Sequence, residues 1–219
     1  MAVVERLDVG FVERWVREAA LGIQAQRDFL TQLDAAIGDA DHGVNMDRGF
    51  AAAVARMDEA PDGLPGSLLE AVGSTLVLSV GGAAGPLYGS AMRAMGRSLG
   101  DADTFDAERL LVLLRAGLEE IQRLGAATVG DKTIVDAFLP ATQAFERGLR
   151  TGEGLPAVAA RARAAAEEGV LATVPLQARK GRASYLGARS VGHQDPGATS
   201  TAILFAALER ATAGEGSGP

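Results

Sequence analysis

The stretch LDAAIGDADHGVNMDRG, from Leu33 to Gly49, places a glycine-bearing turn between two helical patterns. Before the turn, apolar residues recur at intervals of three, four and seven, and a similar pattern resumes at Val44. The same stretch holds three closely spaced carboxylates, on Asp34, Asp39 and Asp41. The sequence therefore predicts a helix–turn–helix unit with an acidic turn.

These carboxylates have two interpretations. Mg²⁺ takes one or two carboxylates and fills its other positions with water and substrate phosphates, so the turn suits a metal–phosphate site. Alternatively, the stretch is a helix end followed by an aspartate that caps the next helix. Spacing alone leaves both open, although like charges this close together favour a bound cation.

Outward from this turn, apolar residues recur at helical intervals along most of the chain. Eight helices are predicted, over residues 11–37, 44–57, 67–80, 87–99, 106–124, 134–149, 155–171 and 198–210. Pro140 is expected to kink or end the sixth. Residues 72–80 also fit a buried strand, but no partner strand is evident. The sequence therefore predicts an all-α single domain over residues 1–210, an eight-helix antiparallel bundle or barrel, with a disordered tail over 211–219.

Composition narrows the class of protein. The 219 residues carry a net charge of −7, which argues against a nucleic-acid or anionic-membrane partner. The chain contains no cysteine, so disulfides, thiolate catalysis and zinc–thiolate sites are excluded. The N-terminus does not resemble a signal peptide, and the longest apolar run, residues 72–80, is too short to span a bilayer. We expect a soluble cytoplasmic protein.

Scarce residue types gather between the predicted helices. The single Asn, both His, both Lys and both Tyr are Asn45, His42, His193, Lys132, Lys180, Tyr88 and Tyr185. They all fall within residues 34–49, 81–90, 125–136 and 177–201. Because loops on a rigid scaffold carry most binding and catalytic residues, these four regions are the predicted functional regions.

The second and third regions are ambiguous in isolation. GGAAGPLYG, from Gly81, lets the backbone approach a ligand and precedes a helix whose N–H groups suit an anion, but it also fits a glycine helix end followed by proline. GAATVGDKT, from Gly125, is a near miss to a P-loop and has no strand before it. Its Lys132 is expected to meet a phosphate or to pair with Asp131 or Asp136.

The fourth region, ARKGRASYLGARSVGHQDPGATS, lacks clear periodicity. Structureless segments of this length are usually functional or disordered. The region holds the most basic stretch of an acidic chain, formed by Arg179, Lys180, Arg182 and Arg189. Such a cluster suits a polyphosphate, and Asp195, in a turn, faces a nucleotide in this interpretation. The alternative is a solvated flexible loop.

Together, IGDADHGVNMDRGF, GGAAGPLYG, GDKTIVDAF and RKGRASYLGARSVGHQDPGATS resemble the dihydroxyacetone kinase L subunit family, DhaL. The resemblance covers essentially the whole chain, in order, and implies an eight-helix antiparallel barrel. It also implies that Asp34, Asp39 and Asp41 bind two Mg²⁺, which hold the phosphates of ADP or ATP.

The same resemblance implies a set of nucleotide contacts and no catalytic side chain. The contacts carried over are His42, Gly43, Asn45, Gly82, Ala83, Ala84, Gly85, Gly125, Ile134, Arg182, Asp195, Pro196 and Gly197. Ala84 departs from relatives that carry serine, which puts a hydroxyl contact at that position in doubt.

By resemblance, the chain is a free-standing L subunit, because its length leaves no room for a second, substrate-binding domain. ADP would stay bound as a coenzyme and be rephosphorylated to ATP by the phosphohistidine protein DhaM. The γ-phosphoryl group would then pass to dihydroxyacetone on the K subunit. The alternatives are an ATP-dependent kinase subunit for another ketose or sugar alcohol, and a nucleotide-loaded regulatory module.

Overall fold

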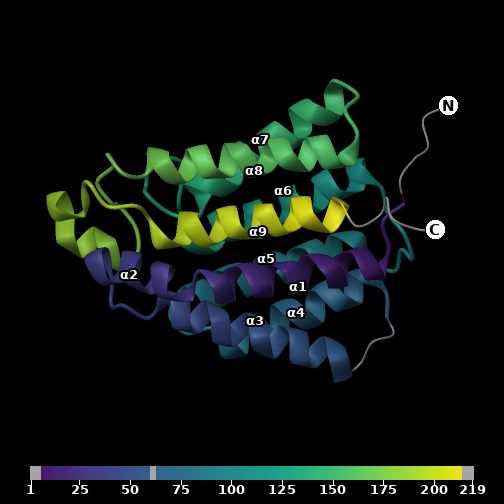
Figure 1. Ribbon diagram of the computed structural model, residues 1–219, viewed down its shortest axis with the longest axis horizontal. Helices are drawn as coiled ribbons and strands as arrows, with labels where there is room; N and C mark the ends of the chain where they lie inside the picture. Colours follow the sequence, from purple (N-terminus) through teal and green to yellow (C-terminus); the bar gives the residue numbers. More distant parts are fainter. Residues whose placement is uncertain (1–5, 60–62, 214–219) are drawn as a thin grey trace.

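The computed structural model describes residues 6–59 and 63–213, which are helical almost throughout (Figure 1). Among the described residues, the only β pairing is an isolated bridge between Leu7 and Phe105. The elements in chain order are α1 (Val9–Ala25), α2 (Arg27–Ile37), α3 (His42–Glu59), α4 (Pro65–Ser79), α5 (Ala84–Leu99), α6 (Ala107–Gly125), α7 (Val135–Arg150), α8 (Leu155–Ala172), the 3₁₀ helix η1 (Arg182–Ser190) and α9 (Pro196–Ala213). The predicted all-α class is confirmed.

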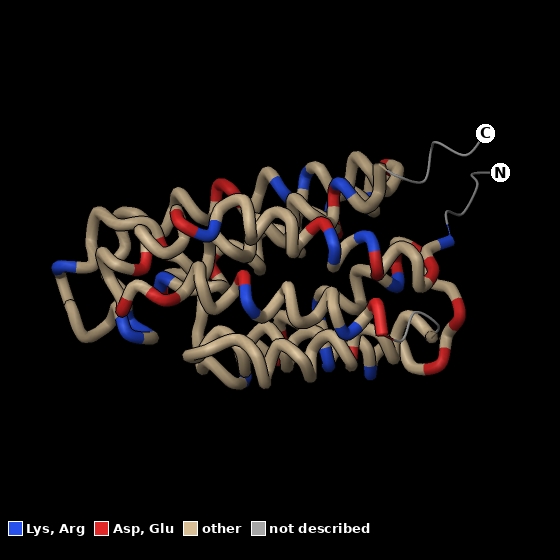
Figure 2. Tube along the Cα trace, turned by 60° about the horizontal axis from the view of Figure 1, so that its bottom comes forward, with Lys and Arg blue, Asp and Glu red and all other residues tan. Residues whose placement is uncertain are grey.

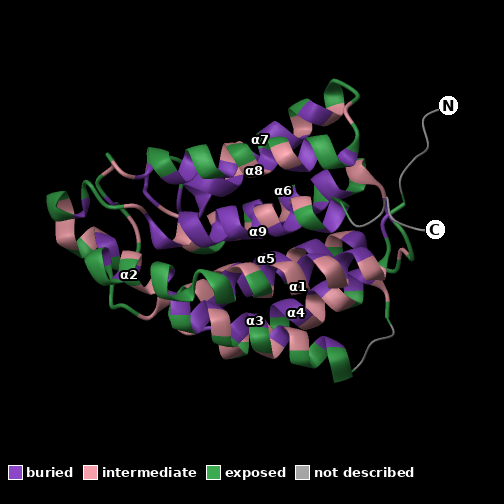
Figure 3. Cartoon of the chain, viewed as in Figure 1, coloured by how far each residue is buried: buried purple, intermediate pink, exposed green. Residues whose placement is uncertain are grey.

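All of the α-helices except α2 form a closed ring, in which each packs against the helix on either side. The order around the ring is α1, α3, α4, α5, α6, α7, α8 and α9, and α9 closes it against α1. Neighbours in the ring run antiparallel along the long axis of the molecule (Figure 1). Inward-facing residues are buried and outward-facing ones exposed (Figure 3). α2 lies at one end, against α3, α9 and η1.

Glycines bring α4 and α5 into direct backbone contact. A Cβ on Gly73 would lie 2.4 Å from the carbonyl oxygen of Gly89, and one on Gly89 would lie 2.5 Å from that of Gly73. Gly66 and Gly96 make a second close approach two turns along these helices. A Cβ on Gly96 would lie 2.4 Å from the carbonyl oxygen of Gly66, and one on Gly66 would lie 3.0 Å from that of Gly96 and 2.4 Å from that of Gly100. Both glycine pairs are spaced by seven residues, so they lie on one face of each helix. Any larger side chain there would push the helices apart.

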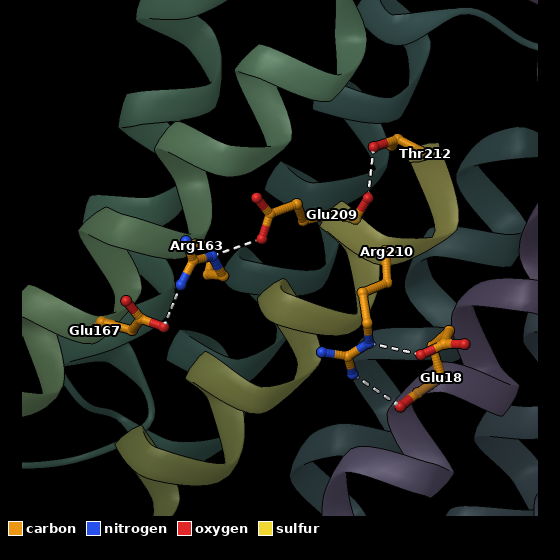
Figure 4. A network of polar contacts seen from close by, with 6 residues as sticks. All are labelled: Glu18, Arg163, Glu167, Glu209, Arg210 and Thr212. Carbon is orange, nitrogen blue, oxygen red and sulfur yellow. Dashed lines mark hydrogen bonds and ion pairs between the residues drawn. The ribbon is translucent and has the colours of Figure 1, made fainter. Parts of the chain in front are cut away.

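Ion pairs connect α9 to both of its neighbours in the ring (Figure 4). Arg163 of α8 lies 2.5 Å from Glu209 of α9, and Arg210 of α9 lies 2.6 Å from Glu18 of α1. These side chains are partly exposed, so each pair contributes only about 0–1 kcal/mol. The buried apolar side chains therefore dominate the stability of the ring.

The first predicted helix is divided in two. The predicted helix over residues 11–37 is interrupted at Gln26, which separates α1 from α2. Gln26 departs from helical geometry, with φ −109° and ψ 11°, although the spacing of apolar residues continues across it. The break lets α2 turn over the end of the ring, where Ile37 packs with Ala178 and Ala183 in a small cluster apart from the main core.

Three smaller differences concern the later helices. Pro140 does not end α7, which continues to Arg150. The segment expected to lack structure contains η1. α9 runs from Pro196 to Ala213, so residues 211–213 of the predicted tail are helical, and residues 214–219 lie outside the described residues. In the part of the chain described, no helix is both long and apolar enough to cross a membrane.

Candidate functional site

Helix direction gathers four helix N-termini at one end of the ring. Because neighbours alternate in direction, α3, α5, α7 and α9 all begin at the end drawn on the left in Figure 1. The first residues of these four helices all line a common cavity; they are His42, Ala84, Val135 and Pro196. Backbone N–H groups at a helix start have no intrahelical partner and carry partial positive charge. This end is therefore suited to bind an anion.

The cavity has a volume of about 350 Å³, within the range of pockets that bind small molecules. It collects most of the residues predicted to form a site. Those in its lining are Asp34, Asp39, Asp41, His42, Gly82, Ala83, Ala84, Gly125, Ile134, Arg182, Asp195, Pro196 and Gly197. Residues more than 150 positions apart in the sequence thus meet at one place.

The three aspartates form one cluster at the N-terminus of α3. Asp34, Asp39 and Asp41 each offer a ligand oxygen, and these oxygens lie within 4.8 Å of one another. Asp34 is buried, and one of its oxygens accepts hydrogen bonds from the backbone N–H groups of Asp41 at 2.9 Å and His42 at 3.1 Å. Asp34 therefore caps α3 with one oxygen and can still offer the other to a cation. Hard oxygen ligands at this spacing fit Mg²⁺.

Arg182 approaches the aspartate cluster from the far end of the sequence. Its guanidinium lies 3.1 Å from a carboxylate oxygen of Asp39, and both side chains reach solvent. Arg182 begins η1, whose neighbours Lys180 and Gly181 also line the cavity. Both signs of charge occur at this end of the molecule (Figure 2). A polyphosphate with bound cations matches that mixture.

A buried polar cluster joins α3, α5 and α9 behind the cavity. The hydroxyl of Tyr88 donates to the carbonyl oxygen of Gly197 at 2.9 Å and lies 2.8 Å from Ser200 Oγ and 2.7 Å from Thr201 Oγ1. Ser200 Oγ also lies 3.0 Å from Nε2 of His42. Burial raises the pKa of Tyr88 and lowers the pKa of His42, so both stay uncharged near neutral pH. The cluster fixes the start of α9 against α3 and α5.

Asp195 begins α9 from a buried position. One of its carboxylate oxygens accepts from the backbone N–H of Ala198 at 2.7 Å, and its own N–H donates to Thr173 Oγ1 at 3.0 Å. Burial raises the pKa of Asp195 to about 7, and the negative charge of Asp136 adds to the rise, while Lys132 opposes it. The carboxyl group therefore changes its protonation near neutral pH at the edge of the cavity.

Lys132 lines the cavity, but it does not form the expected pair with Asp131 or Asp136. Contact with a phosphate, the other expectation, stays a prediction. The Nζ atom of Lys132 donates to three backbone carbonyl groups, described below. Asp131 and Asp136 do not pair with it because their carboxylates accept from backbone N–H groups, those of Thr128 and of Gly130 and Thr133.

Three predicted nucleotide contacts lie behind the cavity wall. A Cβ on Gly43 would lie 2.0 Å from the carbonyl oxygen of Arg27, so Gly43 lets α3 approach α2. A Cβ on Gly85 would lie 2.3 Å from the carbonyl oxygen of Val80. Asn45 is buried against the turn that begins at Gly81, and its Oδ1 accepts from Arg48 Nη2 at 2.8 Å. Their contact with a nucleotide stays a prediction.

An apolar part of the cavity wall was not predicted. It includes Ile37, Leu87, Ile121 and Ala127. In the sequence the first three follow the helical spacing of ordinary core positions, and Ala127 lies between predicted helices. The available signal is positional: Leu87 lies one turn after Ala83, and Ile121 lies one turn before Gly125. A wall of this kind suits the apolar face of a base.

Comparison with known proteins gives a consistent family signal. A model described as the DAK2 domain matches residues 36–210. The chain is 37% identical over 197 residues to "PEP-dependent dihydroxyacetone kinase, ADP-binding subunit DhaL" of Escherichia coli K12, which covers 90% of this chain and 94% of that protein. It is 41% identical over 194 residues to the PTS-dependent DhaL subunit of Lactococcus lactis, covering 89% and 93%.

A solved structure shares the fold. The dihydroxyacetone kinase from C. freundii, in complex with AMP-PNP and Mg²⁺, superposes with a TM-score of 0.65 and 25% sequence identity. The match covers 96% of this chain and 36% of the kinase, so the chain corresponds to about a third of that longer protein.

Proposed function

Because this chain belongs to the DAK2 domain family, among the DhaL subunits of dihydroxyacetone kinase, we propose that it is the nucleotide-binding subunit of such a kinase. ADP bound with Mg²⁺ would be rephosphorylated to ATP by the phosphohistidine protein DhaM. The phosphoryl group would pass to dihydroxyacetone on the K subunit. The proposal places this reaction in the cytoplasm.

The observation that carries the proposal is the position of the aspartate cluster. Asp34, Asp39 and Asp41 lie on the same cavity as the start of α5, which has no side-chain cap. A polyphosphate at this place would meet uncapped backbone N–H groups on one side and cations held by carboxylates on the other. Cation-assisted positioning is most of what phosphoryl transfer requires, so no nucleophilic side chain is needed.

Each group of cavity residues has its own role in binding the nucleotide and its metal ions. Asp34, Asp39 and Asp41 would hold two Mg²⁺, which when bound neutralise charge on the phosphate oxygens. Arg182 would add a charge-assisted contact to the phosphates. The glycines of the 81–85 turn and of the Asp195-Pro196-Gly197 turn would let the backbone approach the ligand. The apolar wall around Ile134 would receive the base.

Release of the bound nucleotide tests the proposal. The purified protein is denatured and the supernatant analysed for ADP, and folded protein is then mixed with phosphorylated DhaM. We expect about one ADP per chain, converted to ATP by DhaM and consumed when K subunit and dihydroxyacetone are added. Free exchange with bulk ATP and indifference to DhaM would instead assign an ATP-dependent kinase subunit.

The number of metal ions has its own measurement. Titration with Mn²⁺, followed by electron paramagnetic resonance, should give two tightly bound ions per chain when ADP is present. A single bound ion would contradict the two-metal arrangement while leaving nucleotide binding intact.

A further inference from the structure

One of the two lysines in the sequence is buried at the centre of a loop. Lys132 is 1% exposed, and its Nζ donates to the carbonyl oxygens of Leu176 at 3.1 Å, Ser190 at 2.6 Å and His193 at 2.5 Å. An ammonium group has three N–H donors, so these carbonyl groups use all of them. No donor is left for a ligand in the cavity.

The backbone before α7 is built to aim this side chain inward. Lys132 has a left-handed φ of +64°, which is uncommon for a residue with a side chain. Asp136 holds the turn, since its two oxygens accept from the N–H groups of Gly130 at 2.6 Å and Thr133 at 2.7 Å. The neighbouring carboxylate, on Asp131, accepts from the N–H of Thr128 at 2.9 Å. Both carboxylates thus stabilise the turn and leave the ammonium to the carbonyl groups.

The three acceptors all belong to residues 174–195, which we call the cover segment. This segment supplies Lys180, Gly181, Arg182 and Ala183 to the cavity lining. Its apolar anchoring is confined to the small cluster that includes Ala178 and Ala183. Lys132 ties the two ends of the segment together, because Leu176 lies before η1 and Ser190 and His193 lie at or after its end.

We propose that Lys132 is a positioning residue: without touching the nucleotide, it fixes the cover segment over the cavity and so determines nucleotide affinity. This inference rests on the proposed nucleotide-binding function. In this role the ammonium group of Lys132 binds carbonyl groups of the segment that carries Arg182, whereas a phosphate-binding lysine would contact the ligand itself.

Hydrogen exchange in nucleotide-free protein tests the first half of the proposal. In Lys132→Met, the amides of Ala178, Arg179 and Gly192 should exchange at least tenfold faster, because each bonds within the cover segment or to the turn before α7. Amides within α4 and α5 should keep their wild-type rates. Lys180→Met is the matched control: it removes the same charge, from the cover segment itself, and should leave these exchange rates unchanged.

Calorimetric titration tests the second half. Lys132→Met should raise the Kd for Mg·ADP at least tenfold, while the Kd for Mn²⁺ alone stays within about twofold, because the three aspartates lie outside the cover segment. Parallel loss of both affinities would show general damage and overturn the proposal, as would unchanged exchange in the segment. Lys132→Gln, which keeps two donors, should give intermediate values. If neither variant gives the wild-type circular dichroism spectrum, the lysine is required for folding and the proposal fails.

The two proposals can fail separately. If wild-type protein binds no ADP, the proposed function is wrong, yet the exchange experiment still decides whether Lys132 fixes the cover segment. If wild-type protein binds ADP and Lys132→Met binds it equally well, only the positioning role is wrong.

Discussion

Asp41→Asn should be more stable than wild type without Mg²⁺ and less stable than wild type when Mg²⁺ is bound. Asp41 contributes one of three carboxylates whose oxygens lie within 4.8 Å of one another. Two unit charges at that distance repel by about 3.5 kcal/mol at an effective dielectric constant of about 20 and by about 0.9 kcal/mol in water. Because Asp39 and Asp41 reach solvent, the lower value applies to most of the repulsion. Losing the charge should therefore stabilise the metal-free protein by about 1–2 kcal/mol.

With Mg²⁺ bound, wild type should become the more stable of the two proteins. At about 100 times its Kd, an ion that binds only the folded state stabilises it by about 2.7 kcal/mol. A variant whose Kd is about 100-fold weaker gains only about 0.4 kcal/mol at the same concentration. For a chain of this size, 1 kcal/mol shifts Tm by about 2–4 °C. Wild type should thus gain about 5–11 °C with Mg²⁺, and Asp41→Asn about 1 °C.

Calorimetric melting in EDTA and across an Mg²⁺ titration measures both effects. Asp101→Asn is the control, since it removes an equal charge from an exposed loop after α5, at the opposite end of the ring. The control should melt in parallel with wild type under all conditions. Equal Mg²⁺-dependent shifts in wild type and Asp41→Asn would refute the metal assignment, and a lower Tm of the variant in EDTA would refute the repulsion argument.

Other substitutions test the fold and its pH dependence. Gly73→Ala places a Cβ 2.4 Å from the carbonyl oxygen of Gly89 and should cost about 1–3 kcal/mol in urea unfolding, whereas Gly63→Ala, with nothing within 4 Å, should leave stability within about 0.5 kcal/mol. Tyr88→Phe should cost about 0.5–1.5 kcal/mol, because it removes the buried hydroxyl that joins α5 to α9, while the Gly197 carbonyl oxygen still accepts from Ser200 and Thr201. Burial raises the pKa of Asp195 to about 7, so the folded state binds more protons than the unfolded state between about pH 4 and pH 7. The free energy of unfolding should therefore fall as pH rises through that window, by at most about 1.4 kcal/mol per pH unit. In Asp195→Asn, measured without metal, this contribution to the pH dependence should disappear. Urea unfolding at several pH values measures the difference.

The aspartate turn shows why sequence spacing left two interpretations open. Capping and metal binding were treated as alternatives, but Asp34 caps α3 with one oxygen while standing in the carboxylate cluster. The cap comes from the preceding helix, seven and eight residues before the N–H groups that it accepts from. Local cap patterns look for an acceptor next to the helix start, so such a contact is visible only after the turn has folded.

Periodicity identified the helices well and their ends less well. Ile23 and Leu30 are seven residues apart and both fully buried, so the apolar pattern passes through Gln26 without a sign of the break. No glycine or proline marks the position, and the contact that Ile37 of α2 makes with the distant cover segment exists only in the folded chain. Lys132 poses the same difficulty, since its acceptors are backbone carbonyl groups that any sequence would supply.

The charge of the site explains why cation and nucleotide would bind together. Asp34, Asp39 and Asp41 without a cation present a negative surface at the start of α3, which repels a polyphosphate despite the helix N-termini around it. One divalent ion leaves the cluster negative, and a second makes it positive. Arg182 is paired with Asp39, and its guanidinium is thus only partly available to a phosphate. Ligation of Asp39 by a cation would compete for that carboxylate and release the guanidinium toward the cavity, so metal binding would add positive charge from the protein as well as from the ion.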